Sequence, residues 1–121
     1  MHELAIAQGI AEAVDAQAQK HQATHVREIH LQIGEAQGVV NDSLTFCFEM
    51  VASLYPLLEG SRLSIEFIPY RARCQHCASE FTVINFIRQC PACQGWETEV
   101  ISGTEMQIDN IEIDAPMQAE E

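Results

Sequence analysis

Two segments of the chain carry apolar side chains at three- and four-residue spacing, which is the pattern of a helix with one buried side. In residues 4–20 polar side chains occupy the opposite side, and Gly9 weakens the helical propensity. In residues 44–55 the apolar stripe is clearer; its members are Leu44, Cys47, Phe48, Val51, Leu54 and Tyr55. We therefore predict two amphipathic helices.

Other segments alternate apolar and polar residues, as expected for strands with one buried face. This pattern covers residues 26–33 and continues in residues 63–69 after the second helix. A further strand is predicted for residues 104–114. Helix, strand, helix and strand in this order favour an α+β fold, in which two helices pack on a small mixed or antiparallel sheet.

Four cysteines interrupt this pattern between the second and the last of these strands. They form two Cys-x-x-Cys pairs, Cys74-Gln-His-Cys77 and Cys90-Pro-Ala-Cys93. Such pairs are typical of a four-thiolate metal site, and zinc is the natural occupant because it accepts tetrahedral sulfur without redox change. Iron in a rubredoxin-like site and a pair of disulfides are the alternatives. A closed site of this kind has no open coordination position, so it would support structure and not catalysis.

The cysteine pairs also suggest how the chain is divided. We expect an α+β domain made of residues 1–70 and 101–121, with an inserted zinc-ribbon-like hairpin in residues 71–100 that forms a zinc-binding domain.

The charge of the chain argues against nucleic acid as a partner. Its 121 residues carry a formal net charge of −12, from 18 acidic residues against six Lys and Arg, whereas binding to phosphate backbones needs clustered basic residues. No apolar run is long enough to span a membrane, and the first residues do not read as a signal peptide. The expected location is a reducing cytoplasm, in which the cysteines stay available for metal.

The first residues, Met1-His2-Glu3, offer a second kind of metal site. The α-amine, the amide nitrogen of His2 and the His2 imidazole can close two chelate rings on one ion, and Glu3 can add its amide or carboxylate. Nitrogen ligation of this kind suits Ni(II) or Cu(II) better than zinc. In the alternative reading, Glu3 only complements the helix dipole and His2 binds nothing.

Several short motifs, taken together, resemble the HypA/HybF family of nickel-insertion accessory proteins for [NiFe] hydrogenase. They are Met1-His2-Glu3-Leu4, Ile33-Gly34-Glu35, Ser43-Leu44-Thr45-Phe46-Cys47-Phe48-Glu49, the two cysteine pairs and Ile111-Glu112-Ile113. The resemblance covers the whole chain, and the motifs occur in the order that they have in the family.

The resemblance implies roles for particular residues. His2 would be the nickel ligand, with the Met1 amine and the backbone or side chain of Glu3 nearby. Asp42, at the start of the second helix, could contribute to the same site. Structural zinc would be held by Cys74, Cys77, Cys90 and Cys93. His76 could tune the zinc site, although a solvated side chain is the simpler interpretation.

The predicted function is that of a nickel metallochaperone. It would bind Ni(II) at its N-terminus and, with a HypB-type GTPase, pass the ion to the precursor of the [NiFe] hydrogenase large subunit. The sequence shows no nucleophile–base pair, phosphate-binding glycine loop or carboxylate dyad, so we do not expect an enzyme. The alternatives are a zinc-ribbon adaptor that binds only other proteins and a rubredoxin-like electron carrier.

Overall fold

The computed structural model describes residues 2–116, and its two helices agree with the predicted amphipathic segments. Helix α1 spans Glu3–Lys20 and α2 spans Asn41–Ala52. The two helices pack against each other. The buried apolar residues of α1 are Ala7, Ile10, Ala11, Val14 and Ala18, and those of α2 are Leu44, Phe48, Val51 and Ala52. The predicted stripe extends too far at one point, because α2 ends at Ala52 and leaves Leu54 exposed.

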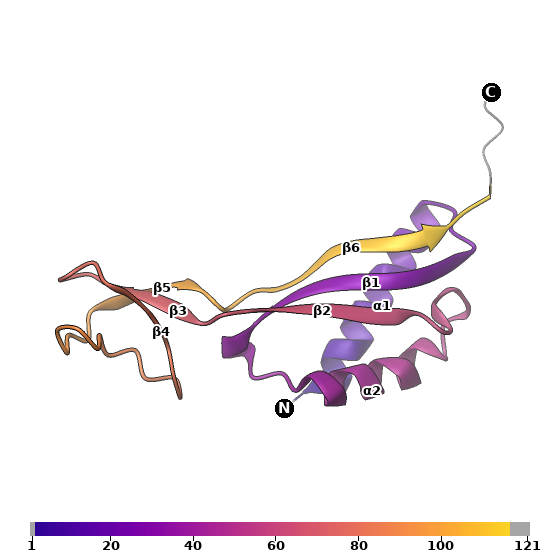
Figure 1. Cartoon of the computed structure of the whole chain (residues 1–121). Coiled ribbons are helices and arrows are strands. Elements are labelled where there is room, and N and C mark those ends of the chain that lie inside the picture. The colour runs from indigo at the N-terminus through magenta and orange to yellow at the C-terminus, as the bar shows by residue number, and fades with distance from the viewer. Residues whose placement is uncertain (1, 117–121) are drawn as a thin grey trace, which may run out of the picture. The chain divides into compact units, whose positions relative to one another are not determined.

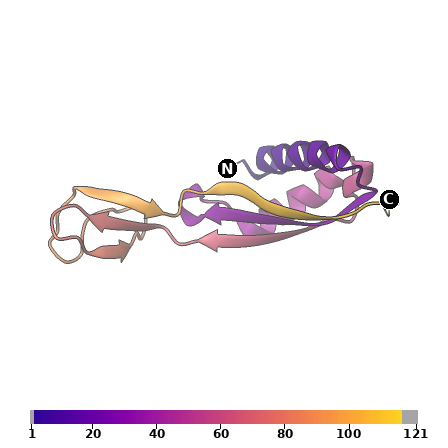
Figure 2. The same ribbon diagram turned by 90° about the horizontal axis from the view of Figure 1, so that it is seen from above.

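A three-stranded sheet has the order β2-β1-β6, so β1 lies in the centre. Its strands are β1 (His25–Gly34), β2 (Arg62–Ile68) and β6 (Met106–Asp114). In Figure 2 the arrows of β1 and β2 point the same way and the arrow of β6 points the opposite way. The bond from the Thr24 N–H to the Asp114 carbonyl, 2.7 Å long, fits this antiparallel pairing. The sheet is therefore mixed, and α2 makes the crossover that two parallel strands require.

The two faces of β1 differ as the alternation predicts. Ile29, Leu31 and Ile33 are buried, whereas the residues that alternate with them, Glu28, His30 and Gln32, are only half-buried. Figures 1 and 2 show α1 running along one face of the sheet. Burial of the apolar residues of α1, α2 and β1 forms the main core of the chain.

A second sheet is formed by the strands next to the cysteine pairs in the chain. It has the order β4-β3-β5, with β3 (Arg71–Cys74), β4 (Glu80–Thr82) and β5 (Thr98–Ser102) all antiparallel. The small core beside it consists of Ala72, Cys74, Phe81, Val83 and Cys90, with Tyr70 packed against it. Two of these five core residues are cysteines, so apolar burial alone gives this sheet little support.

The chain forms two compact units. Within the described residues, the first unit contains residues 2–31, 39–65 and 108–116, and the second contains residues 32–38 and 66–107. The assignment of nickel to one unit and zinc to the other remains a prediction. No helix in residues 2–116 is both long enough and apolar enough to cross a membrane.

Two glycines allow a close backbone approach inside the second unit. A Cβ atom at Gly34 would collide with the carbonyl of Gly103, and one at Gly103 would collide with the backbone of Tyr70. Gly103 also has a φ of +108°, which side chains rarely tolerate. The Ala36 N–H donates to the Gly103 carbonyl at 2.8 Å, so the two segments are joined by a hydrogen bond where they touch.

Candidate metal centres

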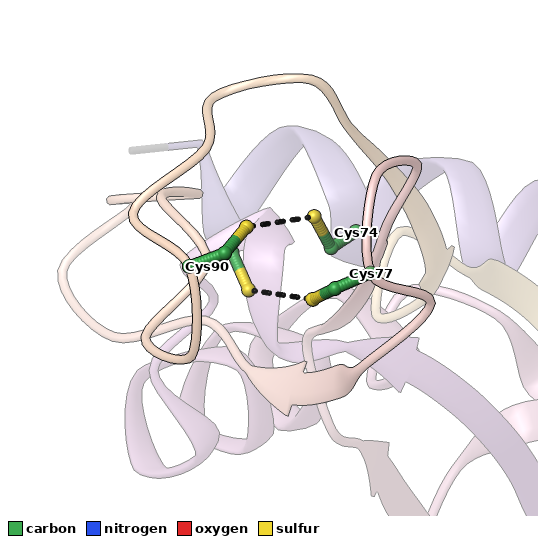
Figure 3. A group of neighbouring side chains, drawn as sticks. Cys74, Cys77 and Cys90 are labelled. Atoms are coloured by element: carbon green, nitrogen blue, oxygen red, sulfur yellow. Dashed lines mark hydrogen bonds between the residues drawn. The ribbon is translucent and has the colours of Figure 1, made fainter.

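The four paired cysteines converge on one point of the second unit. Cys74 ends β3 and Cys77 lies in the turn after it, while Cys90 and Cys93 flank the turn that precedes β5. The Sγ atoms of Cys74 and Cys93 are 3.6 Å apart, as are those of Cys77 and Cys90, and all four lie within 4.8 Å of one another. Figure 3 shows the labelled side chains of Cys74, Cys77 and Cys90 pointing toward a common space.

These distances fit a tetrahedral metal ion. A zinc–sulfur bond of about 2.3 Å places the sulfurs of a regular tetrahedron about 3.8 Å apart. A disulfide would need about 2.05 Å, and all four cysteines are free, so the structure does not contain the alternative pair of disulfides. The His76 N–H also lies 3.4 Å from the Cys74 sulfur, where it can stabilise a thiolate. The cluster could therefore hold a metal such as zinc.

The thiols of this cluster ionise unequally. The Ser79 hydroxyl and N–H lower the pKa of Cys77 to about 6, and backbone N–H groups of Cys77 and His76 lower the pKa of Cys74. The Gly95 N–H lowers the pKa of Cys93, but the neighbouring Cys74 thiol and burial outweigh it and raise that pKa to about 12. A metal ion must displace the protons that remain, so acid weakens its binding.

The start of α1 is organised differently from the cysteine cluster. Met1 lies outside the described residues. His2 is the N-cap residue of α1, and its side chain is exposed and makes no capping hydrogen bond. The sequence prediction singled out His2 and Glu3, but among residues 2–116 neither belongs to a preassembled group of metal-ligating side chains. An exposed imidazole leaves its nitrogens free for an incoming ion.

The Glu3 carboxylate has a structural partner in the first unit. Glu3 is only 7% exposed, and its carboxylate accepts a hydrogen bond of 3.1 Å from the N–H of Val40, the N-cap residue of α2. This hydrogen bond lowers the pKa of Glu3. Since Glu3 is also in the first turn of α1, its negative charge lies beside the amino ends of both helices, where it is stabilising. Asp42, which is exposed, is in the first turn of α2.

Replacing Glu3 with glutamine is expected to destabilise the first unit at neutral pH. Because the folded-state pKa of Glu3 is lowered, its carboxylate stabilises the fold above its unfolded pKa and loses this effect as the pH falls through the folded pKa. The difference in melting temperature between wild type and Glu3→Gln should therefore be largest near pH 7 and shrink in acid. Glu12→Gln, at an exposed position of the same helix, is the control. An equal difference in melting temperature near pH 7 and in acid would contradict this role of the Glu3 carboxylate.

His76 agrees with its solvated interpretation. Its side chain is 60% exposed, and its Nε2 lies 2.7 Å from Glu97.

Sequence reasoning missed a different histidine. His30 forms a group with Glu28 and Glu112 whose possible ligand atoms all lie within 4.8 Å of one another. Alternation already indicates that Glu28 and His30 share a face of β1, but nothing in the sequence pattern brings residue 112 beside them.

Comparison with known proteins identifies similar chains over nearly the full length. Residues 1–113 match the family described as "Hydrogenase/urease nickel incorporation, metallochaperone, hypA". The hydrogenase maturation factor HypA of Dehalococcoides mccartyi is 40% identical over 119 residues, which cover 98% of this chain and 99% of the relative. The protein of the same name from Streptomyces avermitilis is 44% identical over 110 residues, covering 89% and 83%.

A solved structure shows the same fold. The solution structure of the Ni metallochaperone HypA from Helicobacter pylori aligns with a TM-score of 0.67 at 20% identity, covering 96% of this chain and 100% of that one. At this identity the likeness bears on the fold alone.

Proposed function

Because the chain belongs to the HypA family of nickel-incorporation metallochaperones, we propose that it binds Ni(II) through His2 and the Met1 amine and releases it to a hydrogenase precursor. The chain is a nickel metallochaperone of [NiFe] hydrogenase maturation, and membership of this non-catalytic family makes it a carrier and not an enzyme. In this role nickel is the cargo.

The observation that carries the proposed nickel site is the exposure of His2 at an anchored helix start. The Glu3 carboxylate fixes the first turn of α1 to Val40, so His2 leaves the fold at a defined place while its imidazole stays free. Imidazole and deprotonated backbone nitrogens suit Ni(II). Positive potential at a helix amino end opposes a cation, and the charge of Glu3 offsets it. Glu3 then contributes to the site through its backbone and its charge, with Asp42 as a further candidate ligand.

An exposed site also suits a carrier. Ligands at the surface can be exchanged one at a time for those of an acceptor, whereas a closed cage would retain the ion. We propose that Cys74, Cys77, Cys90 and Cys93 bind zinc as a structural ion, because four sulfurs fill its tetrahedral coordination. The two metals would then have separate tasks.

The proposed partners are those of hydrogenase maturation. A HypB-type GTPase would act with this chain, and the precursor of the [NiFe] hydrogenase large subunit would receive the nickel. A cytoplasmic location is proposed as well, because the free cysteines of the cluster need a reducing compartment.

Nickel titration of zinc-loaded protein tests the amino-terminal site. Wild type is compared with His2→Ala and with a variant that carries one extra residue before Met1. The extension displaces the α-amine while His2 stays in the chain, so in both variants the affinity of the amino-terminal site for Ni(II) should fall at least about tenfold. His21→Ala, an exposed histidine of the same unit, is the control and should bind as wild type does.

Equal nickel affinity in wild type and both variants would refute the amino-terminal site. It would favour the alternative of a zinc-ribbon adaptor, which needs the cysteine cluster and is indifferent to His2.

A further inference from the structure

A second group of metal-ligating side chains lies on the sheet of the first unit. Glu28 and His30 are on β1, and Glu112 is on the neighbouring strand β6. The His30 Nε2 lies 2.8 Å from a Glu112 carboxylate oxygen, and one ligand atom from each residue lies within 4.8 Å of the others. All three side chains are half-buried.

We propose that Glu28, His30 and Glu112 bind a divalent first-row transition-metal ion of the kind represented by Ni(II) and Zn(II). One imidazole nitrogen and two carboxylate oxygens are ligands that such ions accept. Metal–ligand bonds of about 2.0–2.2 Å place ligand atoms about 3–4 Å apart, which is within the spacing of this group. Three protein ligands leave positions open for water or for a ligand from another molecule.

The backbone holds these ligands in place. Glu28 and His30 are two residues apart on the central strand, so they project from the same face. Glu112 comes from an edge strand that is hydrogen-bonded to β1. Ligands on paired strands need little rearrangement to meet an ion, whereas the proposed ligands at the amino terminus must fold around theirs.

The neighbouring arginines do not block the site. Arg62 lies 3.2 Å from Glu28, but its side chain is 78% exposed and can turn into solvent. Arg27 lies 3.5 Å from Glu112 and closer, at 2.9 Å, to Asp114, so it keeps a partner when Glu112 turns to a metal ion. These exposed ion pairs are weak competitors. The hydrogen bond between His30 and Glu112 is the contact that the ion would replace.

The test removes the proposed amino-terminal site first. Zinc-loaded protein that carries His2→Ala is titrated with Ni(II) by calorimetry, and its zinc content is measured before and after. We expect this protein to bind one equivalent of Ni(II) in addition to its zinc. Adding His30→Ala should weaken this binding at least about tenfold, and adding Glu112→Gln should weaken it as well. Adding His21→Ala should leave it unchanged.

A second measurement locates the ion. When Co(II) is added to the His2→Ala protein, paramagnetic broadening should first affect the amide signals of residues 28–30 and 111–113. Circular dichroism establishes that the double variants remain folded. If the His30→Ala variant does not fold, Glu112→Gln still tests the site, because glutamine keeps the shape of the side chain.

Two results would overturn the proposal. One is that the zinc-loaded His2→Ala protein binds no Ni(II). The other is an equivalent that survives His30→Ala and Glu112→Gln or that broadens signals elsewhere. Both results leave the amino-terminal site untouched, because that site is tested by the difference between wild type and His2→Ala.

Discussion

Replacing Cys90 with serine is expected to unfold the second unit and to release the zinc ion that we propose it binds. Cys90 is fully buried, and it belongs both to the four-sulfur cluster and to the five-residue core of this unit. Binding of structural zinc contributes about 10–16 kcal/mol to the folding of small four-ligand domains, more than a core of this size can supply. Loss of one ligand therefore removes the main source of stability.

Metal analysis and amide NMR spectra measure this effect. Purified Cys90→Ser should contain far less than one zinc per chain, and the amide signals of residues 71–102 should collapse toward random-coil positions. Cys47→Ser is the matched control, since Cys47 is a free cysteine of α2 outside the cluster. A Cys90→Ser protein with unchanged signals for the second unit would show that the cluster is not structural.

Replacing Phe48 with alanine should destabilise the first unit by about 3–5 kcal/mol. Phe48 is 1% exposed, and it is one of the largest fully buried side chains of the chain. Removing a buried phenyl ring loses its transfer free energy and leaves a cavity that neighbouring side chains fill only in part. Urea unfolding, followed by the helical circular dichroism signal, measures the change.

Phe46 offers a close control for this experiment. It lies on the same helix, two residues earlier, but is 62% exposed. Phe46→Ala should change the free energy of unfolding by no more than about 0.5 kcal/mol. Equal losses for the two variants would mean that the assignment of the buried side of α2 is wrong.

The periodicity of the sequence predicts the elements of the fold well, but it does not predict how the strands pair. The three- and four-residue spacing in α1 and the alternation in β1 depend on local side-chain directions, which a sequence displays directly. The parallel pairing of β1 with β2 depends on the crossover through α2. The apolar stripe predicts a second helix that is too long at its end, because Leu54 continues the stripe although α2 ends at Ala52.

The candidate sites differ in the same way: contacts between residues close in the sequence could be predicted, and contacts between distant residues could not. Cys-x-x-Cys spacing is local, so the four-cysteine cluster could be predicted in full. The hydrogen bond of Glu3 to Val40 spans 37 residues, and the contact of His30 with Glu112 spans 82. Neither follows from spacing along the chain. Both depend on which elements become neighbours in the folded unit.

The position of β6 has a consequence for the order of events during protein synthesis. This strand pairs with β1, yet residues 66–105, which belong to the second unit, precede it in the chain. A polypeptide emerges from the ribosome amino end first, so the cysteine segment becomes available before β1 can acquire its last neighbour. Contacts such as that between Thr24 and Asp114, 90 residues apart, close late because they must close a long loop. The nascent chain could therefore bind the proposed zinc ion while the helical unit is still incomplete.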